Sequence, residues 1–473
     1  MSWIHLFGHI LFVLLLGYYL ITNLQWYNYK LSRILLHHHA PYQHILFFLL
    51  PLFGYLALRE WVLALDLVYG AVFYFWQRKL DKKLVFTSRV KRFFVLLFLF
   101  TLVLDMLFMI KGIKLYSTLL PLAVTLLVSN IIEKYLFMIF YKEAKKKLKK
   151  IDPIIVAITA SYGKTSIKNF LTQILQDNYR VYKTPRSVNT LAGIMKDINE
   201  SLPEDTQIYI VEAGARERGD IASIAKLIEH QYAIIGKIGE QHIEYFQSLE
   251  NIILTKLEIL LSKRLKKAFI WDGLEIKDDE KFVKYGKNIK NIQADLEGVS
   301  WGVELDGKEY HFFAPVLGDF NALNITAAIL AAREIGLDME IIQKRVRHLK
   351  PVEHRLQKIE AGGKLIIDDS FNGNLEGMVS SYELVKGYPG RKVIVTPGIV
   401  ESTPQANEKL ARKINEVFDL VIITGKLNRE ILDKAITKKK ILLDDKQMLQ
   451  NVLAESTKAG DLILFSNDTP AFM

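Results

Sequence analysis

The sequence predicts an α/β protein preceded by a helical membrane region, and three observations support this fold class. The first 150 of the 473 residues contain five long apolar runs. After Lys150 the chain alternates between apolar, β-branched segments and helical stretches, which is typical of a doubly wound parallel sheet. The loop between the first predicted strand and its helix ends in Gly163-Lys164-Thr165, as in a phosphate-binding loop.

Charge is distributed unevenly along the chain. Residues 1–150 carry 19 Lys and Arg against 6 Asp and Glu, whereas the remaining residues carry 43 against 45. The basic residues lie between apolar runs and do not form one face, so no nucleic-acid partner is expected. The chain has no cysteine, which excludes disulfides, thiolate catalysis and cysteine metal sites.

The apolar runs predict about five membrane-spanning helices. They are residues 3–22, 44–58, 61–76, 93–110 and 115–133. The first is about long enough to cross a ~30 Å hydrocarbon core and lacks the features of a removable signal peptide. The segments that follow the first, third and fifth runs are basic, and positive-inside reasoning places all three in the cytoplasm. We therefore expect a multi-pass membrane protein with its N-terminus outside and its large domain in the cytoplasm.

Three polar features of this region have competing interpretations. Asp66 and Asp105 are candidates for a transport path, but each lies about five residues from the outer end of its run, where snorkelling or local water is expected to satisfy it. The run His37-His38-His39 is a candidate metal site, although a solvated or headgroup-facing loop is the preferred interpretation.

The phosphate-binding loop is predicted in detail. Residues 154–158 read as a buried strand, 159–163 as a tight loop, and Lys164 onward as a helix. Backbone N–H groups and the helix N-terminus would surround a phosphate, Lys164 would reach the outer phosphates, and the Thr165 hydroxyl would hold Mg²⁺. Ile158 stands where the general pattern has its first glycine, so only the second half of the pattern is met.

The rest of the chain divides into two predicted units. Strands at 207–212, 232–239 and 266–271 belong with the loop, and strands at 364–369, 392–397, 419–425 and 461–465 belong to a second, Rossmann-like unit. The predicted domains are 1–150, 151–352 and 353–473. Ligands of such sheets collect at the C-terminal ends of the strands. Glu212 closes one of these strands and His242 follows another, and Asn321 and Asn324 lie near the start of a later helix.

Six motifs, in order, resemble the Mur ligase family over roughly residues 153–400. They are TASYGKTS, VEAGARERGDI, IGEQHIEYFQSLENIILTKLEIL, GDFNALNITAA, HRLQ and IDDSFNGN. The resemblance implies a P-loop-type, ATP-dependent amide ligase of bacterial peptidoglycan synthesis, located at the cytoplasmic membrane. It is greatest to members that add D-alanyl-D-alanine to UDP-N-acetylmuramoyl-tripeptide through an acyl phosphate.

The resemblance also implies roles for individual residues. The nucleotide would be bound by Ser161, Gly163, Lys164, Thr165, Ser166, Asn321, Asn324, Arg355 and Asp369. Two Mg²⁺ ions would be held by Thr165, Glu212, His242 and Lys256, the last as a carbamate. Lys164, His242, Lys256 and Arg355 would be catalytic, and Asn372 would lie near the incoming amine. Without the resemblance, Lys256 reads as a surface lysine paired with Glu250 or Glu258.

Three departures from the family pattern leave the substrate open. In the loop, Ala160 replaces a glycine and Tyr162 replaces a small polar residue. The KGSR-like motif that the family has near its donor site is absent, and apolar runs stand where the family has a domain that recognises the UDP-sugar. One alternative is a ligase acting on a lipid-linked or other carboxylate. Another is a membrane scaffold that uses the fold to hold other cell-wall enzymes without catalysis.

Overall fold

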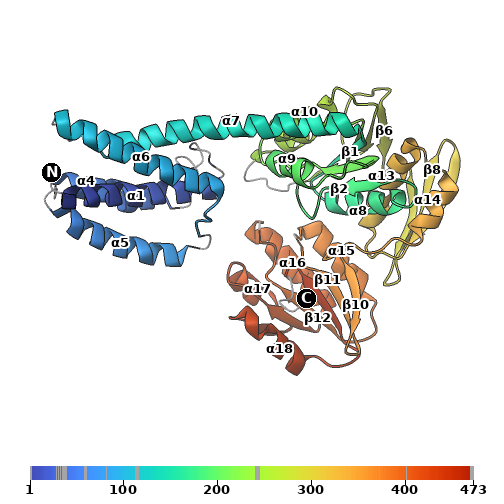
Figure 1. Ribbon diagram of the computed structural model, residues 1–473. Coiled ribbons are helices and arrows are strands. Elements are labelled where there is room, and N and C mark those ends of the chain that lie inside the picture. The colour runs from blue at the N-terminus through green and yellow to red at the C-terminus, as the bar shows by residue number, and fades with distance from the viewer. Residues whose placement is uncertain are drawn as a thin grey trace. The chain divides into compact units, whose positions relative to one another are not determined.

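The fold is taken from a computed structural model, which describes residues 3–27, 29, 31, 34, 40–57, 61–80, 83–111, 117–239, 246–371, 373–400 and 402–468. The chain forms two compact units, Met1–Ile139 and Phe140–Met473. The first unit is helical and the second is α/β (Figure 1).

The first unit is built from apolar helices. They are α1 (Trp3–Trp26), α3 (Tyr42–His44), η1 (Ile45–Leu49), α4 (Leu50–Ala57), α5 (Val62–Lys79), α6 (Ser88–Lys111) and the first part of α7 (Leu119–Ile151). Helix α1 packs against both α5 and α6, and its Phe12, Val13 and Leu16 are fully buried. The five predicted apolar runs are largely helical where they are described, and Ser117 and Thr118 form a turn before α7.

Length and composition support fewer membrane spans than the sequence predicted. Among the described residues, only His5–Trp26 and Leu119–Ile151 are long and apolar enough to cross a membrane. Helix length and composition therefore do not support the prediction of about five membrane spans. The apolar helix Tyr42–Ala57 is shorter, and the 18-residue α5 includes Asp66, Arg78 and Lys79.

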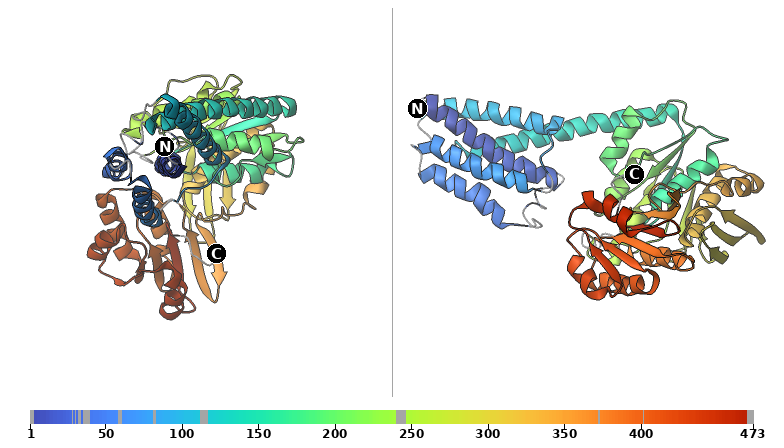
Figure 2. Two further views of the ribbon diagram at one scale, coloured as in Figure 1. Left: turned by 60° about the vertical axis from the view of Figure 1, so that its left-hand side comes forward. Right: turned by 90° about the horizontal axis from the view of Figure 1, so that it is seen from below.

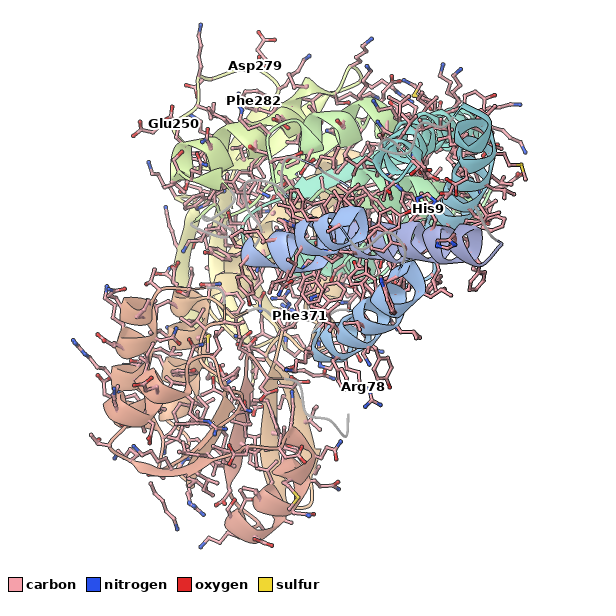
Figure 3. All side chains as sticks on the ribbon, turned by 90° about the vertical axis from the view of Figure 1, so that its left-hand side faces the viewer. His9, Arg78, Glu250, Asp279, Phe282 and Phe371 are labelled. Atoms are coloured by element: carbon pink, nitrogen blue, oxygen red, sulfur yellow. The ribbon has the colours of Figure 1, made fainter. Side chains whose placement is uncertain are left out.

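The side chains of Asp66 and Asp105 do not extend to the surface of the helical unit, as the snorkelling interpretation requires. Both are buried, with 3% and 4% of their surface exposed. Asp105 Oδ2 lies 2.7 Å from Nδ1 of His9, whose Nε2 lies 3.4 Å from the Thr118 hydroxyl. Figure 3 labels His9 on its helix. The carboxylate oxygens of Asp66 have no hydrogen-bond partner among the described residues.

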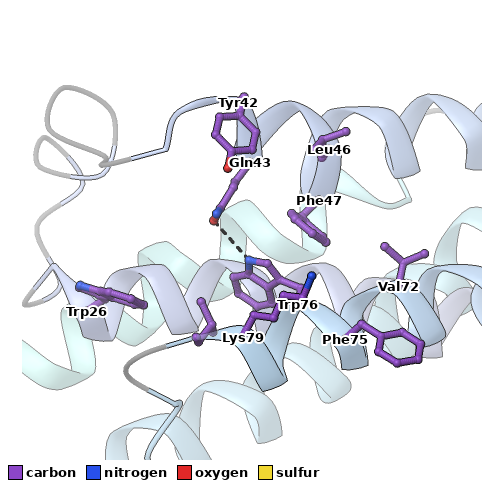
Figure 4. A pocket seen from close by; sticks show the side chains of 10 residues that line it. Trp26, Tyr42, Gln43, Leu46, Phe47, Val72, Phe75, Trp76 and Lys79 are labelled. Atoms are coloured by element: carbon purple, nitrogen blue, oxygen red, sulfur yellow. Dashed lines mark hydrogen bonds between the residues drawn. The ribbon is translucent and has the colours of Figure 1, made fainter. Parts of the chain in front are cut away.

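A cavity of about 390 Å³ lies in the same helical unit. Its walls are mostly aromatic and aliphatic, and Trp76 Nε1 donates to Gln43 Oε1 across it at 3.2 Å (Figure 4). Lys79 supplies the one cation among the residues that line it.

The second unit begins without a break in helix α7. Ala144 and Leu148 of this helix are buried. Lys145 pairs with Glu229 at 2.7 Å, and Lys150 pairs with Glu204 at 2.9 Å. Strand β1 (Ile154–Thr159) starts three residues after the helix ends. The basic end of α7 is thus packed onto the α/β unit that follows it.

The first sheet of the α/β unit is parallel and has the order β2-β3-β1-β4-β5-β6. Its strands are β1, β2 (Val181–Lys183), β3 (Ile208–Glu212), β4 (Tyr232–Ile235), β5 (Lys267–Trp271) and β6 (Phe282–Tyr285). The predicted strand at 232–239 is shorter than expected. Around the sheet lie α8 (Lys164–Leu175), α9 (Leu191–Glu200), α10 (Asp220–Ile228), α12 (Leu249–Leu257), η3 (Glu258–Leu261), α13 (Phe320–Ile335) and α14 (Met339–Val346). Strand β1 lies between β3 and β4, so the loop that follows it is central.

A small antiparallel sheet follows, which the sequence analysis did not predict. It has the order β7-β8-β9, with β7 (Ile289–Ala294), β8 (Val299–Leu305) and β9 (Lys308–Ala314). Trp301 and Phe312 stack at 5.4 Å and belong to the same hydrophobic core as α13.

The last sheet has the order β10-β11-β15-β12-β13-β14. Its strands are β10 (Gln357–Ala361), β11 (Lys364–Asp369), β12 (Lys392–Thr396), β13 (Leu420–Ile423), β14 (Lys439–Leu442) and β15 (Leu462–Ser466). All neighbours are parallel except β10 and β11. Helices α15 (Leu375–Lys386), α16 (Pro404–Val417) and α17 (Arg429–Ala435) share one core with it, and α18 (Leu449–Ser456), preceded by η4 (Lys446–Met448), shares another. Figure 2 shows this sheet and its helices in orange to red. This agrees with the predicted Rossmann-like unit.

Candidate active site

The glycine-lysine loop closes tightly between β1 and α8. The backbone N–H groups of Ser161 and Tyr162 donate to the Lys237 carbonyl at 3.0 and 3.3 Å. Gly163 has φ +81°, a left-handed conformation that favours glycine. A Cβ atom at this position would collide with the side-chain oxygen of Asn324. The loop therefore requires glycine for both its backbone conformation and its contact with α13.

Lys164 is the first residue of α8 and folds over the loop. Its Nζ donates to the carbonyls of Ala160 and Ser161 at 2.7 and 3.1 Å. Burial lowers the pKa of Lys164 to about 8, while the Glu212 carboxylate opposes this shift and the Arg355 cation adds to it. Lys164 is therefore the cation of the loop, and it interacts electrostatically with Glu212 and Arg355.

Glu212 ends β3 beside the loop and is 2% exposed. Its Oε2 accepts from the Thr165 hydroxyl at 3.0 Å and lies 3.1 Å from Lys168 Nζ. Its Oε1 has a longer contact of 3.4 Å with Asn189 Nδ2. Carboxylate and hydroxyl oxygens are the ligands that Mg²⁺ prefers. The adjacent oxygens of Thr165 and Glu212 therefore fit part of a magnesium site.

Lys256 lies on α12 and is 4% exposed. The interpretation as a surface lysine is therefore wrong. Burial lowers the pKa of Lys256 well below its ordinary value, the Lys164 cation adds to this, and Glu212 and Asp220 oppose it. Glu258 instead accepts from the backbone N–H groups at the start of α10, Gly219 at 2.7 Å and Ala222 at 3.0 Å. An ammonium on Lys256 is thus disfavoured beside the loop.

Helix α13 supplies two buried amides near the loop. Its first residues are capped by Asp319, whose Oδ1 accepts from the Phe320 N–H. Asn321 Nδ2 donates to the Leu317 carbonyl at 2.7 Å, and Asn324 Nδ2 donates to Asn321 Oδ1 at 3.1 Å. Asn324 also packs against Gly163, so α13 and the loop form one surface.

Residues from the C-terminal sheet complete the cluster. The Arg355 guanidinium lies 4.7 Å from the ring centroid of Phe371, which is labelled in Figure 3. Burial raises the pKa of Asp369 to about 6, and Arg355 opposes that rise. Burial lowers the pKa of Arg355, with Asp369 and Glu212 opposing. The charges of Arg355, Asp369, Glu212 and Lys164 therefore act on one another across the two sheets.

The structure brings most of the predicted site residues together. Those it places at the loop or in electrostatic contact with it are Ser161, Gly163, Lys164, Thr165, Ser166, Glu212, Lys256, Asn324, Arg355 and Asp369. His242 and Asn372 lie outside the described residues. Within the described part of the chain, no group of three or more His, Asp or Glu residues could hold a metal ion.

Sequence reasoning missed four polar residues around the site. Lys168 and Asn189 both contact Glu212, and His354 Nδ1 lies 2.7 Å from Asp368 Oδ2, beside Arg355 and Asp369. In the sequence, His354 and Asp368 could have been found only because they precede Arg355 and Asp369, which were predicted to bind the nucleotide. Lys168 follows Lys164 by four residues, and this one-turn spacing placed it on the same helix face.

These features define a class of protein. A glycine-lysine loop at the centre of a parallel sheet, with a hydroxyl and a carboxylate beside it, is a site for the phosphates of a nucleotide. A family model for the Mur ligase middle domain matches residues 158–332.

Known proteins narrow this class. A UDP-N-acetylmuramoyl-tripeptide–D-alanyl-D-alanine ligase of Bacillus subtilis is 30% identical over 350 residues, covering 68% of this chain and 74% of the relative. The crystal structure of the MurF ligase from Thermotoga maritima in complex with ADP has 27% identity and a TM-score of 0.60, covering 70% of this chain and 79% of that one. A MurF structure from Acinetobacter baumannii, at 23% identity and TM-score 0.60, shares the fold. The chain belongs to the Mur ligase family.

Proposed function

We propose that the chain is an ATP-dependent, ADP-forming ligase that joins D-alanyl-D-alanine to UDP-N-acetylmuramoyl-tripeptide in peptidoglycan precursor synthesis. The observation that supports this most directly is the hydrogen bond between Thr165 and the buried Glu212, beside Lys164, in a chain 24–30% identical to named ligases of that reaction. The solved relative that contains ADP supports the choice of nucleotide.

Negative charge develops on phosphate oxygens during the reaction, and cationic side chains of this chain would stabilise it. The terminal phosphate of ATP would pass to the peptide carboxylate, giving ADP and an acyl phosphate. The amine of D-alanyl-D-alanine would then form the amide bond as inorganic phosphate leaves and the amine proton is lost. Lys164 and Arg355 would stabilise the negative charge that develops on the transferring group. Ser161, Gly163 and Ser166 would line the phosphates, and Asn321, Asn324 and Asp369 would contact the rest of the nucleotide.

Magnesium is proposed at the same place. Thr165, Glu212, His242 and a carbamate on Lys256 would hold two ions, which neutralise phosphate charge when bound. The buried position of Lys256 and its lowered pKa favour the neutral amine that reacts with CO₂. A carbamate would give this position an anionic oxygen in place of a cation.

We also propose that the helical unit is embedded in the bacterial cytoplasmic membrane, with about five helices crossing it and the α/β unit in the cytoplasm. The two helices that meet the length and hydropathy criteria support a membrane position for this unit. The number of five crossings rests on the apolar runs and on the basic segments that flank them. A membrane position would also suit contact with other cell-wall enzymes. It favours one second candidate, a ligase whose carboxylate substrate is lipid-linked.

The test uses the full-length protein in detergent. ADP release is measured with UDP-muramoyl-tripeptide and with a lipid-linked muramoyl peptide, each with D-alanyl-D-alanine. Turnover with the first substrate supports the proposal, turnover with the second alone supports the lipid-linked candidate, and turnover with neither contradicts both. Lys164→Ala should lower the rate by about 10² or more, as removal of one preorganised donor does. The matched control is Lys196→Ala, because Lys196 is exposed and its ion pair within the described part of the chain is with Glu200 on α9.

A further inference from the structure

Lys168 is a buried lysine without an assigned role. It lies on α8, one helical turn after Lys164, and is 1% exposed. Its Nζ lies 3.1 Å from Glu212 Oε2 and donates to the Arg186 carbonyl at 2.5 Å. A fully buried ammonium is costly unless it is paired and hydrogen-bonded, and both conditions are met here.

The bonds to Glu212 are unequal between its two oxygens. Oε2 accepts from Thr165 at 3.0 Å and is paired with Lys168, whereas Oε1 has, among the residues that the structure describes, one longer contact, at 3.4 Å with Asn189. Charge-assisted contacts are the stronger ones, so Lys168 and Thr165 fix the direction of the carboxylate. Oε1 is left as the oxygen that can accept a further electropositive partner.

Lys168 also holds the segment between β2 and α9 through a hydrogen bond. Arg186 has φ +43°, an uncommon conformation for a residue other than glycine, and its carbonyl accepts from Lys168. The segment is also tied to β3, because the Glu212 N–H donates to the Thr184 hydroxyl at 3.2 Å and the Gly214 N–H donates to the Asn189 carbonyl at 2.8 Å. Lys168 thus joins α8, the end of β3 and this segment at one point.

We propose that Lys168 is a positioning residue, which fixes Glu212 Oε2 so that Oε1 is presented to a divalent cation. This inference rests on the magnesium site of the proposed function. Groups that orient a metal ligand without touching the metal typically change its affinity 10–100-fold when they are removed. If the pair were purely structural, removing Lys168 would lower stability, because Glu212 would be left buried and unpaired. It would not change the affinity of the folded protein for the cation.

The experiment measures metal binding directly, by electron paramagnetic resonance of Mn²⁺ added to the full-length protein without nucleotide. Lys168→Met should weaken Mn²⁺ binding by about tenfold or more and raise the Mg²⁺ concentration for half-maximal turnover by a similar factor. Lys168→Arg, which keeps the charge, should recover part of the affinity. The matched control is Lys183→Met, because Lys183 bonds to Asn169 of the same helix and not to Glu212.

Unchanged or tighter Mn²⁺ binding by a folded Lys168→Met protein would overturn the inference. If that variant does not fold, Lys168→Gln decides, because it removes the charge and keeps a hydrogen-bond donor. Wild-type protein that neither binds Mn²⁺ nor forms product would contradict the proposed function and this inference together. Active wild type beside a variant with normal Mn²⁺ affinity would contradict only the role of Lys168.

Discussion

Lys164 shows how burial sets the chemistry of a single residue. Its pKa of about 8 means that the free protein loses this cation as pH rises above 8, whereas phosphate binding favours the protonated form. Nucleotide affinity should therefore fall between about pH 8 and pH 10, by up to about tenfold per pH unit. Calorimetry with a nonhydrolysable ATP analogue measures this. Lys164→Arg should bind with little change over the same range, and an equally steep fall in that variant would assign the effect to another group.

Lys256 gives a second prediction at this scale. Lys256→Ala should be nearly inactive, because the proposed carbamate oxygen is lost, and acetate or formate should restore part of the rate by occupying the vacated position. Wild-type activity should fall when CO₂ and bicarbonate are removed from the buffer. Glu258 cannot take over, because its two oxygens are bound at the start of α10. Full activity of the alanine variant without added acid would remove the carbamate from the mechanism.

The sequence predicted the residues that occur in motifs at strand ends and missed those that act through distant partners. Gly163, Lys164 and Thr165 lie in and after the short loop that follows β1, and Glu212 is the last residue of β3. The strand pattern therefore located them. Lys168 was not identified, because a lysine in a helix is usually exposed and its partner Glu212 lies 44 residues away. Lys256 is buried because of how α12 packs, and the residues around Lys256 in the sequence do not predict that packing.

Among the elements, the helical unit holds an unusual contact between α1 and α6. His9 and Asp105 are both almost fully buried and lie 2.7 Å apart. Asp105→Leu should destabilise this unit by about 3 kcal/mol or more, because removing one partner leaves the other buried and unpaired. Combining it with His9→Phe should restore part of the loss. Thermal unfolding in detergent measures both effects, and a double variant no better than the single one would argue against coupling.

The elements also differ in how well they were predicted. Strands β3, β5, β11 and β15 lie within one residue of their predicted bounds, because each is centred on a continuous apolar stretch. Strands β3, β5 and β15 also lie between parallel neighbours. The sheet β7-β8-β9 was missed, although Asp306-Gly307 between β8 and β9 is a typical hairpin signal. Its outer strands β7 and β9 are partly exposed and contain several polar residues. The alternation of apolar and polar residues that predicts a strand is therefore weak in them.

For the whole molecule, the proposed topology makes a clear prediction. Reporter fusions after Lys114 and after Lys150 should give opposite sidedness, because the last apolar run lies between them and only the second site follows a strongly basic segment. The fusion after Lys150 should be cytoplasmic. The same sidedness at both sites would contradict a membrane crossing by this run, and replacing the lysines of 142–150 by glutamine tests whether the basic charge sets the orientation.

Both six-stranded sheets have edges that discourage pairing with another chain. The edge strand β2 has three residues, and the edge strands β6, β10 and β14 carry Lys284, Lys358 and Lys439-Lys440. Short or lysine-bearing edges resist the addition of further strands. If the protein is confined to a membrane, its local concentration is high, and this edge chemistry would keep neighbouring copies from aggregating through their sheets.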